Sequence, residues 1–120
     1  MTTIGDGVGP SNAEVLVPAF AKLQGENFEY YMRKYSIMLG RNSKKKSVDL
    51  DLRDLGGGMG ISRHHARIYY DFTFRCFALE VIGRKGCIIK NVLFMPGNPP
   101  IKLDSQDLLQ IGEVRYSCEF

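Results

Sequence analysis

The chain has 120 residues, of which 44% are hydrophobic and 24% charged, a balance that is typical of one globular domain and excludes a disordered chain. Its net charge is only +3, so the composition does not favour general adhesion to nucleic acid. No apolar run approaches the roughly 20 residues of a membrane-spanning helix, and the first residues lack the order of a secretory signal peptide. We therefore expect no membrane association.

The first segment of the chain differs in composition from the rest. Residues 1–18 contain no aromatic residue and are rich in Gly, Ser, Thr and Asn. We expect a flexible lead-in over residues 1–18 and one folded domain over residues 19–120.

In the predicted domain, apolar residues recur at every second position, which is the period of a half-buried β-strand. This alternation predicts strands in five segments: 35–39, 47–54, 65–70, 77–81 and 114–120. The residues expected to face the core are Tyr35, Ile37, Leu39, Val48, Leu50, Leu52, Ala66, Ile68, Tyr70, Phe77, Leu79, Val81, Val114, Tyr116, Cys118 and Phe120. Turn signals separate these segments, and LDSQDLL (103–109) is interpreted as a loop that leads into a strand. The pattern predicts an all-β protein, a β-sandwich.

The three cysteines, Cys76, Cys87 and Cys118, all lie among residues of strand character. Their number is odd, and no two have the spacing of metal ligands. Interpreted as small buried hydrophobic residues in a reducing compartment, they predict a cytosolic or nuclear protein.

The positive charge is concentrated in the middle of the chain. Residues 33–90 contain 13 Lys and Arg against 5 Asp and Glu, a balance of +8, whereas the two flanks together carry −5. Three predicted turns hold most of these basic residues. They are GRNSKKK (Arg41, Lys44, Lys45 and Lys46), ISRHHAR (Arg63, His64, His65 and Arg67) and GRKG (Arg84 and Lys85). Because loops at one end of a sandwich often share a surface, we expect an anion pocket there.

Other kinds of site fit this cluster less well. His64 and His65 are adjacent, so in a strand they point to opposite faces and are poorly placed to share a metal ion. Neither Lys-Ser/Thr nor a helix follows the glycines of LGGGMG (55–60), as a nucleotide loop requires. A nucleophile elbow and a DNA recognition helix are also lacking. We expect a protein that is not an enzyme and has no catalytic residue, metal or cofactor.

An anion clamp is the interpretation that remains. Arg41 offers a fork of donors suited to a phosphate, and Ser62 offers a hydroxyl and a backbone N–H in a loop. A phosphorylated side chain brings about −1.5 to −2 charges and three acceptor oxygens. Arginine-bearing pockets recur among domains that bind such side chains.

Three motifs occur in order along the chain. They are LGR at Leu39–Arg41, ISRHHA at Ile61–Ala66, and L-x-x-G-x-V-x-Y on Leu109, Gly112, Val114 and Tyr116. In this order they resemble a forkhead-associated (FHA) domain over roughly residues 20–120, in particular those of nuclear, transcription-linked regulators of fungi and plants. The resemblance implies a sandwich of about eleven strands with ligand loops at one end. It also implies a non-catalytic module that binds a phosphothreonine segment of a partner protein, in the nucleus.

The resemblance implies roles for single residues. Gly40 would shape the strand end, and Arg41 would bind phosphate or peptide backbone. Ser62 would bind the phosphate, and Arg63 the phosphate or the peptide main chain. His65 would be the packed structural histidine that supports the serine loop, and His64 would be exposed.

One segment departs from the family pattern, which commonly has Asn-Gly after the next strand. Here GRKG places Lys85 before Gly86, and we assign Arg84 and Lys85 to the phosphopeptide site. An alternative alignment uses Asn91, which no glycine follows. Because lysine donates hydrogen bonds but accepts none, recognition of the peptide main chain must differ.

Two other functions remain open from the sequence. One is a phosphate-independent scaffold that forms homodimers through a sandwich face or an edge strand. The other is a weak nucleic-acid contact through the basic middle segment, although direct binding of nucleic acid is not favoured.

Overall fold

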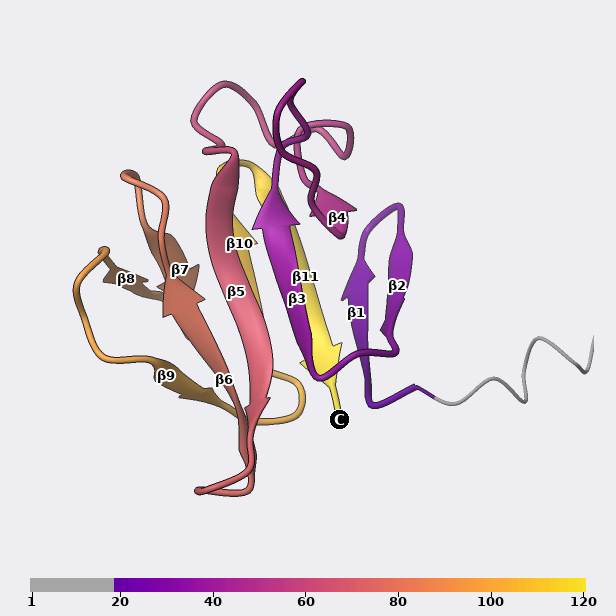
Figure 1. Ribbon diagram of the computed structural model, residues 1–120, viewed down its shortest axis with the longest axis vertical. Coiled ribbons are helices and arrows are strands. Elements are labelled where there is room, and N and C mark those ends of the chain that lie inside the picture. Colours follow the sequence, from indigo (N-terminus) through magenta and orange to yellow (C-terminus); the bar gives the residue numbers. More distant parts are fainter. Residues whose placement is uncertain (1–18) are drawn as a thin grey trace, which may run out of the picture.

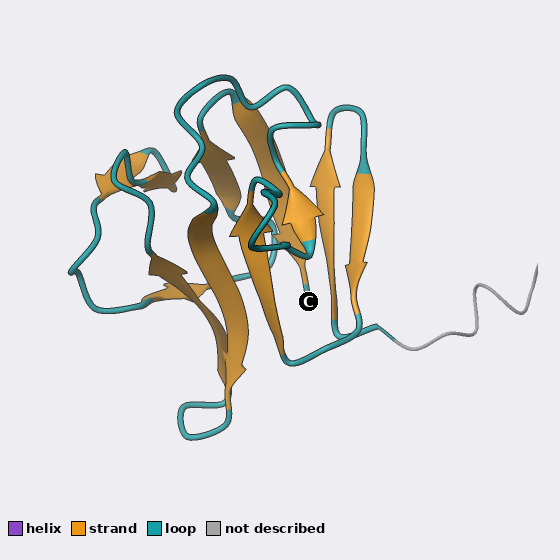
Figure 2. Cartoon of the chain, turned by 45° about the horizontal axis from the view of Figure 1, so that its top comes forward, coloured by secondary structure: helices purple, strands orange, loops and turns teal. Residues whose placement is uncertain are grey.

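The computed structural model describes residues 19–120, which form two β-sheets packed face to face (Figure 1). One sheet has six strands in the order β2-β1-β11-β10-β7-β8, and the other has five in the order β4-β3-β5-β6-β9. These residues contain strands and loops without a helix (Figure 2), so they include no helix that could cross a membrane. The architecture confirms the predicted all-β sandwich. The expected lead-in over 1–18 lies outside the described residues.

The eleven strands are short. In chain order they are β1 (Ala21–Gly25), β2 (Glu29–Met32), β3 (Ser36–Gly40), β4 (Leu50–Asp51), β5 (His64–Asp71), β6 (Cys76–Val81), β7 (Cys87–Ile89), β8 (Val92–Phe94), β9 (Ile101–Leu103), β10 (Leu108–Ile111) and β11 (Val114–Glu119). The pairs are antiparallel except for β3 and β4, which run parallel.

The core lies between the two sheets and consists of the inward positions of both. Leu39 of β3, Ile68 of β5, Leu79 of β6 and Ile111 of β10 are fully buried. Burial of one such side chain contributes roughly 1.5–3 kcal/mol, so the alternation in sequence stabilises the two layers directly. The sandwich thereby provides a rigid base for the loops at its ends.

Two aromatic residues expected in the core lie at its margin. Tyr35 precedes β3, is 48% exposed, and stacks on Phe20 with ring centroids 4.2 Å apart. Phe120 follows β11, is 40% exposed, and stacks on Phe77 at 4.3 Å. Tyr35 lies just before the first residue of β3 and Phe120 just after the last residue of β11, so both continue the alternation beyond the end of a strand.

The predicted strand over 47–54 is also shorter than expected, because only β4 forms there. Asp51 Oδ1 accepts hydrogen bonds from the backbone N–H groups of Arg53 and Asp54 at 3.0 and 3.3 Å. This side-chain-to-backbone pattern turns the chain at Asp51. Leu52 is nevertheless fully buried, as its apolar character predicts.

The cysteines follow the prediction in two of three cases. All three are free; Cys87 and Cys118 are buried, whereas Cys76 is half-buried at the start of β6. Burial raises the pKa of the Cys87 and Cys118 thiols to about 12, so both remain protonated and behave as small hydrophobic residues.

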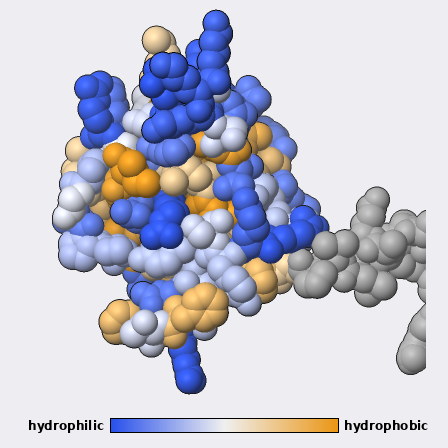
Figure 3. Space-filling model, in the orientation of Figure 1, coloured by the Kyte–Doolittle hydropathy of each residue, from blue (hydrophilic) through white to orange (hydrophobic). Residues whose placement is uncertain are grey.

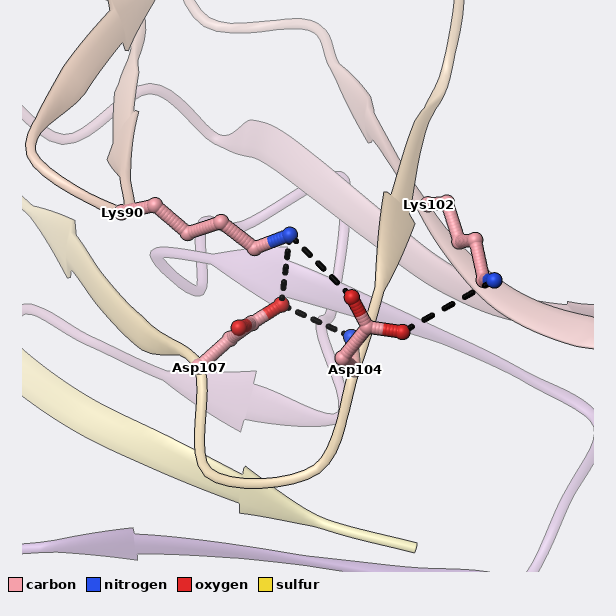
Figure 4. A network of polar contacts seen from close by, with 4 residues as sticks. All are labelled: Lys90, Lys102, Asp104 and Asp107. Atoms are coloured by element: carbon pink, nitrogen blue, oxygen red, sulfur yellow. Dashed lines mark hydrogen bonds and ion pairs between the residues drawn. The ribbon is translucent and has the colours of Figure 1, made fainter.

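A polar network joins the β7–β8 turn to the β9–β10 loop (Figure 4). Lys90 Nζ lies 3.2 Å from Asp104 Oδ2 and 3.4 Å from Asp107 Oδ2, and Lys102 Nζ lies 3.8 Å from Asp104 Oδ1. Asp107 Oδ2 also accepts a 2.7 Å hydrogen bond from the backbone N–H of Asp104. Lys90, Lys102 and Asp104 are exposed, and ion pairs at exposed positions contribute little to stability, so the network mainly positions the two turns.

Candidate functional site

Three loops at one end of the sandwich surround an open pocket of about 370 Å³. They are residues 41–49 after β3, 52–63 before β5 and 82–86 after β6, all toward the upper end of Figure 1. The pocket is lined by Arg41, Met59, Gly60, Ile61, Ser62, Arg63, Arg84 and Lys85. The structure therefore brings together all five residues that the sequence analysis assigned to phosphopeptide contact.

Arg41 is fixed by its own hydrogen bonds to the facing loop. Its Nε donates to the carbonyl oxygen of Ile61 at 2.9 Å, and its backbone N–H lies 3.2 Å from the carbonyl oxygens of Ser62 and Arg63. Its terminal guanidinium groups have no hydrogen-bond partner among residues 19–120. A planar guanidinium held through Nε and free at its ends is suited to bind two oxygens of one anion.

Gly40 allows the two strands to approach closely at the entrance to the pocket. It pairs with His64 across a β-bulge that separates it from Leu39, at the end of β3. A Cβ atom at Gly40 would collide with the carbonyl oxygen of Arg63. Glycine is therefore required at position 40, because any side chain there would push Arg41 away from the loop that carries Ser62 and Arg63.

Ser62 differs from the expectation in one respect. Its backbone N–H, which was expected to be available to an anion, donates a 3.0 Å hydrogen bond to Nδ1 of His65. That donor is engaged inside the protein, so the hydroxyl is the group that Ser62 offers to a ligand. The side chain is half-buried at the pocket wall.

His65 is fully buried and uses both ring nitrogens. Nδ1 accepts from Ser62, and Nε2 donates a 2.8 Å hydrogen bond to the carbonyl oxygen of Gly86. This pair of bonds defines the neutral tautomer with the proton on Nε2. Desolvation by burial lowers the pKa of His65 from its ordinary value of 6.5, whereas the bond to Gly86 opposes the shift.

His64 lies on the opposite side of β5. It was expected to be exposed, but it is half-buried, and it does not line the pocket.

The turn at 83–86 is fixed to the same histidine. Gly83 N–H donates to the carbonyl oxygen of His65 at 2.8 Å, and Gly86 N–H donates to that of Gly83 at 3.0 Å. A Cβ atom at Gly83 would collide with the imidazole ring, and Gly86 has a positive φ of 78°. Both glycines are therefore needed to present Arg84 and Lys85 in this turn. The sequence analysis predicted the turn at GRKG but gave Gly83 no role in the site.

The position of Lys85 distinguishes the two alignments considered for the departure from the family pattern. Its aliphatic chain passes Gly60, where a Cβ atom would lie 3.4 Å from Lys85 Cδ. Asn91 lies instead in the β7–β8 turn with a positive φ of 68° and does not line the pocket. Lys85, rather than an asparagine, occupies the rim.

The charge of the pocket has one sign. Four cationic side chains line it, those of Arg41, Arg63, Arg84 and Lys85, and no carboxylate does. None of the four forms an ion pair with another residue of the range 19–120. Hydrophilic side chains predominate at the upper end of the molecule in Figure 3. Uncompensated cations around a pocket create a positive potential that attracts anions.

Two other features of the sequence lie outside the pocket. Lys44, Lys45 and Lys46 are exposed in the loop after β3 and do not line it. Among the residues that the structure describes, no group of three His, Cys, Asp or Glu side chains is arranged to hold a metal ion.

A β-sandwich that gathers arginines, a lysine and a serine hydroxyl on its end loops has the construction of a binding module for an anionic group. The sequence model of the FHA domain matches residues 37–112. The chain belongs to the FHA domain family, whose members are binding modules.

Curated relatives agree with this assignment. The chain is 65% identical to the Transcriptional activator FHA1 of Nicotiana tabacum over 109 residues, which cover 91% of this chain and 52% of the relative. It is 66% identical to the FHA domain-containing protein FHA2 of Arabidopsis thaliana over 108 residues, covering 90% and 33%. The chain thus spans about half or less of the length of these relatives.

A solved structure supports the fold. The MEK1 FHA domain in complex with a HOP1 phosphothreonine peptide superposes with a TM-score of 0.68 at 18% identity, covering 86% of this chain and 98% of that chain. At this identity the likeness concerns the two-sheet architecture.

Proposed function

We propose that this domain binds a phosphothreonine-containing segment of a partner protein. The observation that carries the proposal is the convergence of Arg41, Ser62, Arg63, Arg84 and Lys85 on one pocket without a carboxylate. A phosphate monoester brings about −1.5 to −2 charges and three acceptor oxygens, which match a site with four cationic donors and a hydroxyl.

Each polar group has a distinct part in the proposed complex. The free end of the Arg41 guanidinium binds two phosphate oxygens, and the hydroxyl of Ser62 donates to the third. Arg63 is exposed at the rim, where it binds the phosphate or the peptide main chain, and Arg84 and Lys85 extend the positive rim on the 83–86 turn. His65 touches no ligand; it fixes the loop of Ser62 and the turn of Arg84 and Lys85 relative to each other.

The names of the relatives support a cellular setting. The tobacco relative is named a transcriptional activator, and a Candida albicans relative, 31% identical over 101 residues, is named a fork-head transcriptional regulator. We infer that this domain acts in the nucleus as part of a regulator of transcription. The solved complex of the MEK1 domain supports phosphothreonine as the chemical class of the ligand.

A paired titration tests the proposal. The domain is titrated by calorimetry with a threonine-containing peptide pool and with the same pool phosphorylated on threonine, at fixed ionic strength. Binding of the phosphorylated pool alone is expected. Equal binding of both pools would instead support a phosphate-independent scaffold. A steep salt dependence with single-stranded or duplex DNA and no peptide preference would support nucleic-acid binding.

Whether the domain forms homodimers is tested separately, by sedimentation equilibrium of the free domain. If the domain is a monomer and still binds the phosphorylated pool, ligand binding does not require self-association.

A further inference from the structure

The turn at 83–86 carries two exposed cations whose charge the domain itself does not balance. Arg84 and Lys85 both line the pocket, and neither forms an ion pair with another residue of the described range. By contrast, Arg67 on the outer face of β5 is paired with Glu80 at 3.2 Å. Other exposed basic residues, among them Arg75 and Arg115, also lack an ion pair within the described range; what distinguishes Arg84 and Lys85 is that they line the pocket.

The backbone beneath these two cations is held firmly. Gly83 N–H donates to His65, Gly86 N–H donates to Gly83, and the Gly86 carbonyl accepts from the His65 ring. A turn with three such bonds presents its side chains from a fixed position. The stem of Lys85 lies beside Gly60, which places Lys85 next to the segment that carries Ser62.

One phosphate does not balance the charge of the whole pocket. The four lining cations carry a formal charge of +4 (one each on Arg41, Arg63, Arg84 and Lys85). A single phosphate monoester supplies about −1.5 to −2, so roughly two positive charges remain uncompensated. Arg41 and Ser62 together suffice to hold one phosphate, which leaves the 83–86 turn available to another group.

We propose that Arg84 and Lys85 form a second anion subsite beside the phosphate subsite of Arg41 and Ser62. The preferred ligand then carries, close to the phosphothreonine, a second anionic group, which is a carboxylate or another phosphate. This inference rests on the proposed function. Lys85 favours such a ligand because an ammonium group donates to anionic oxygens and accepts nothing from a peptide N–H.

The expected strength follows from exposure. Arg84 and Lys85 are exposed, and ion pairs at exposed positions are weak and screened by salt. We therefore expect the second anion to increase affinity about three- to tenfold at low salt, and less at high salt.

The test uses two single peptides and two series made from one sequence. The single peptides are the unphosphorylated form and the phosphothreonine form with neutral flanks. The series are phosphothreonine peptides with glutamate at each flanking position in turn, and the same scan with phosphoserine. Each is titrated against wild type, Arg84→Gln, Lys85→Gln and the double variant. Lys45→Gln is the matched control, because it removes one exposed positive charge from a side chain that does not line the pocket. Thermal unfolding checks that every variant is folded.

In the expected result, wild type and Lys45→Gln bind a doubly anionic peptide about three- to tenfold more tightly than the peptide with neutral flanks. The double variant binds the doubly anionic peptide no more tightly than the peptide with neutral flanks, but it still binds the latter. A gain with glutamate, with phosphoserine or with both supports the subsite and identifies its source.

The inference is overturned if wild type binds the neutral-flank phosphopeptide and gains nothing from a second anion, or if the double variant keeps the full gain; the proposed function stands in both cases. If no phosphorylated peptide binds better than the unphosphorylated one, both proposals fall together.

Discussion

Nε2 of His65 donates a 2.8 Å hydrogen bond to the carbonyl oxygen of Gly86, 21 residues further along the chain. The other nitrogen of the same ring accepts from Ser62 N–H at 3.0 Å. One buried side chain therefore connects the loop that carries the serine hydroxyl with the turn that carries two of the cations. The geometry of the pocket depends on a residue that does not line it.

Replacing this histidine is expected to destabilise the whole domain. His65→Ala leaves a cavity and removes the partners of the half-buried Ser62 N–H and the buried Gly86 carbonyl, which costs about 1–3 kcal/mol. His64→Ala is the control and is expected to be close to neutral, because His64 is half-buried and no side-chain hydrogen bond is found for it within residues 19–120. Urea unfolding measures both. A larger cost for His64 than for His65 would contradict this assignment.

The same histidine predicts a dependence of stability on pH. Because burial lowers the pKa of His65 below its ordinary value of 6.5, the unfolded chain binds a proton more tightly than the folded domain does. The free energy of unfolding therefore contains a contribution that is fully present above about pH 6.5 and is lost as the pH falls toward the lower folded pKa. Protonation would also put a hydrogen on Nδ1, which could then no longer accept the hydrogen bond from the Ser62 N–H.

The pH prediction is measured by urea unfolding of wild type and His65→Gln between about pH 5 and 7.5. The difference between the two curves is expected to narrow as the pH falls, since the variant lacks the titrating group. Parallel curves would show that His65 does not account for the pH dependence. Stability is the better readout than affinity, because a phosphate group itself titrates near pH 6.

Arg41→Ala and Ser62→Ala are expected to weaken binding of a phosphothreonine peptide without unfolding the domain. Each removes a hydrogen bond to a charged group, worth about 1.5–3 kcal/mol, so the dissociation constant should rise roughly ten- to 150-fold. Ser62→Ala is the cleaner variant, because the backbone bond to His65 is retained. Calorimetry measures both, with Arg115→Ala on β11 as a control outside the pocket. Unchanged affinity in both would refute the assigned pocket.

The lysines of the loop after β3 are expected to affect the association rate more than the final affinity. Lys44, Lys45 and Lys46 are exposed and do not line the pocket, so they act on the ligand through the long-range field. Changing all three to Ser should slow association at low salt, with the difference shrinking above about 0.15 M. Stopped-flow kinetics at several salt concentrations measures this. A loss of affinity that is independent of salt would mean direct contact with the ligand.

Tyr116 provides a test of the core. Its side chain is fully buried in β11, and its hydroxyl has no hydrogen-bond partner among residues 19–120. Burial raises the pKa of this phenol well above 10, so it remains neutral. Tyr116→Phe removes a desolvated polar atom and keeps the packing, so stability should be unchanged or higher by up to about 1–2 kcal/mol.

Urea unfolding measures this change as well. Tyr31→Phe serves as the comparison, because the Tyr31 hydroxyl is exposed and bonds to Glu29 at 3.4 Å. That substitution is expected to change stability by less than about 0.5 kcal/mol. A clear destabilisation by Tyr116→Phe would mean that the hydroxyl is satisfied by a buried water molecule.

The sequence predicted the segments of the longest strands, β5, β6 and β11, and missed most of the short ones. Alternation identified the segments of β3, β5, β6 and β11, because each has an apolar residue at two or more successive inward positions, which are every second residue. Six strands of three to five residues, β1, β2, β7, β8, β9 and β10, lie outside the predicted segments. Such short segments offer too few positions for a period to be read, and pairing with a neighbour defines them.

What the sequence by itself determined was the two-sheet class, through the period of its apolar residues, and the family, through LGR, ISRHHA and the final motif in order. It also determined that the basic residues fall in loops, because charge and turn residues coincide along the chain. These are local properties, carried by neighbouring residues, and they need no knowledge of distant contacts.

Only the tertiary structure decided how the pocket is assembled. It assigned the Ser62 N–H to His65 rather than to a ligand, and it placed Lys85 rather than Asn91 at the rim. It also revealed why Gly40 and Gly83 are needed, since a Cβ atom at either would collide with groups on another segment. Apart from the bond between Ser62 and His65, which are three positions apart, these relationships join residues that are distant in sequence. The approaches at Gly40 and Gly83 depend on how β3, β5 and β6 pair within one sheet, and no pattern within one segment specifies that pairing.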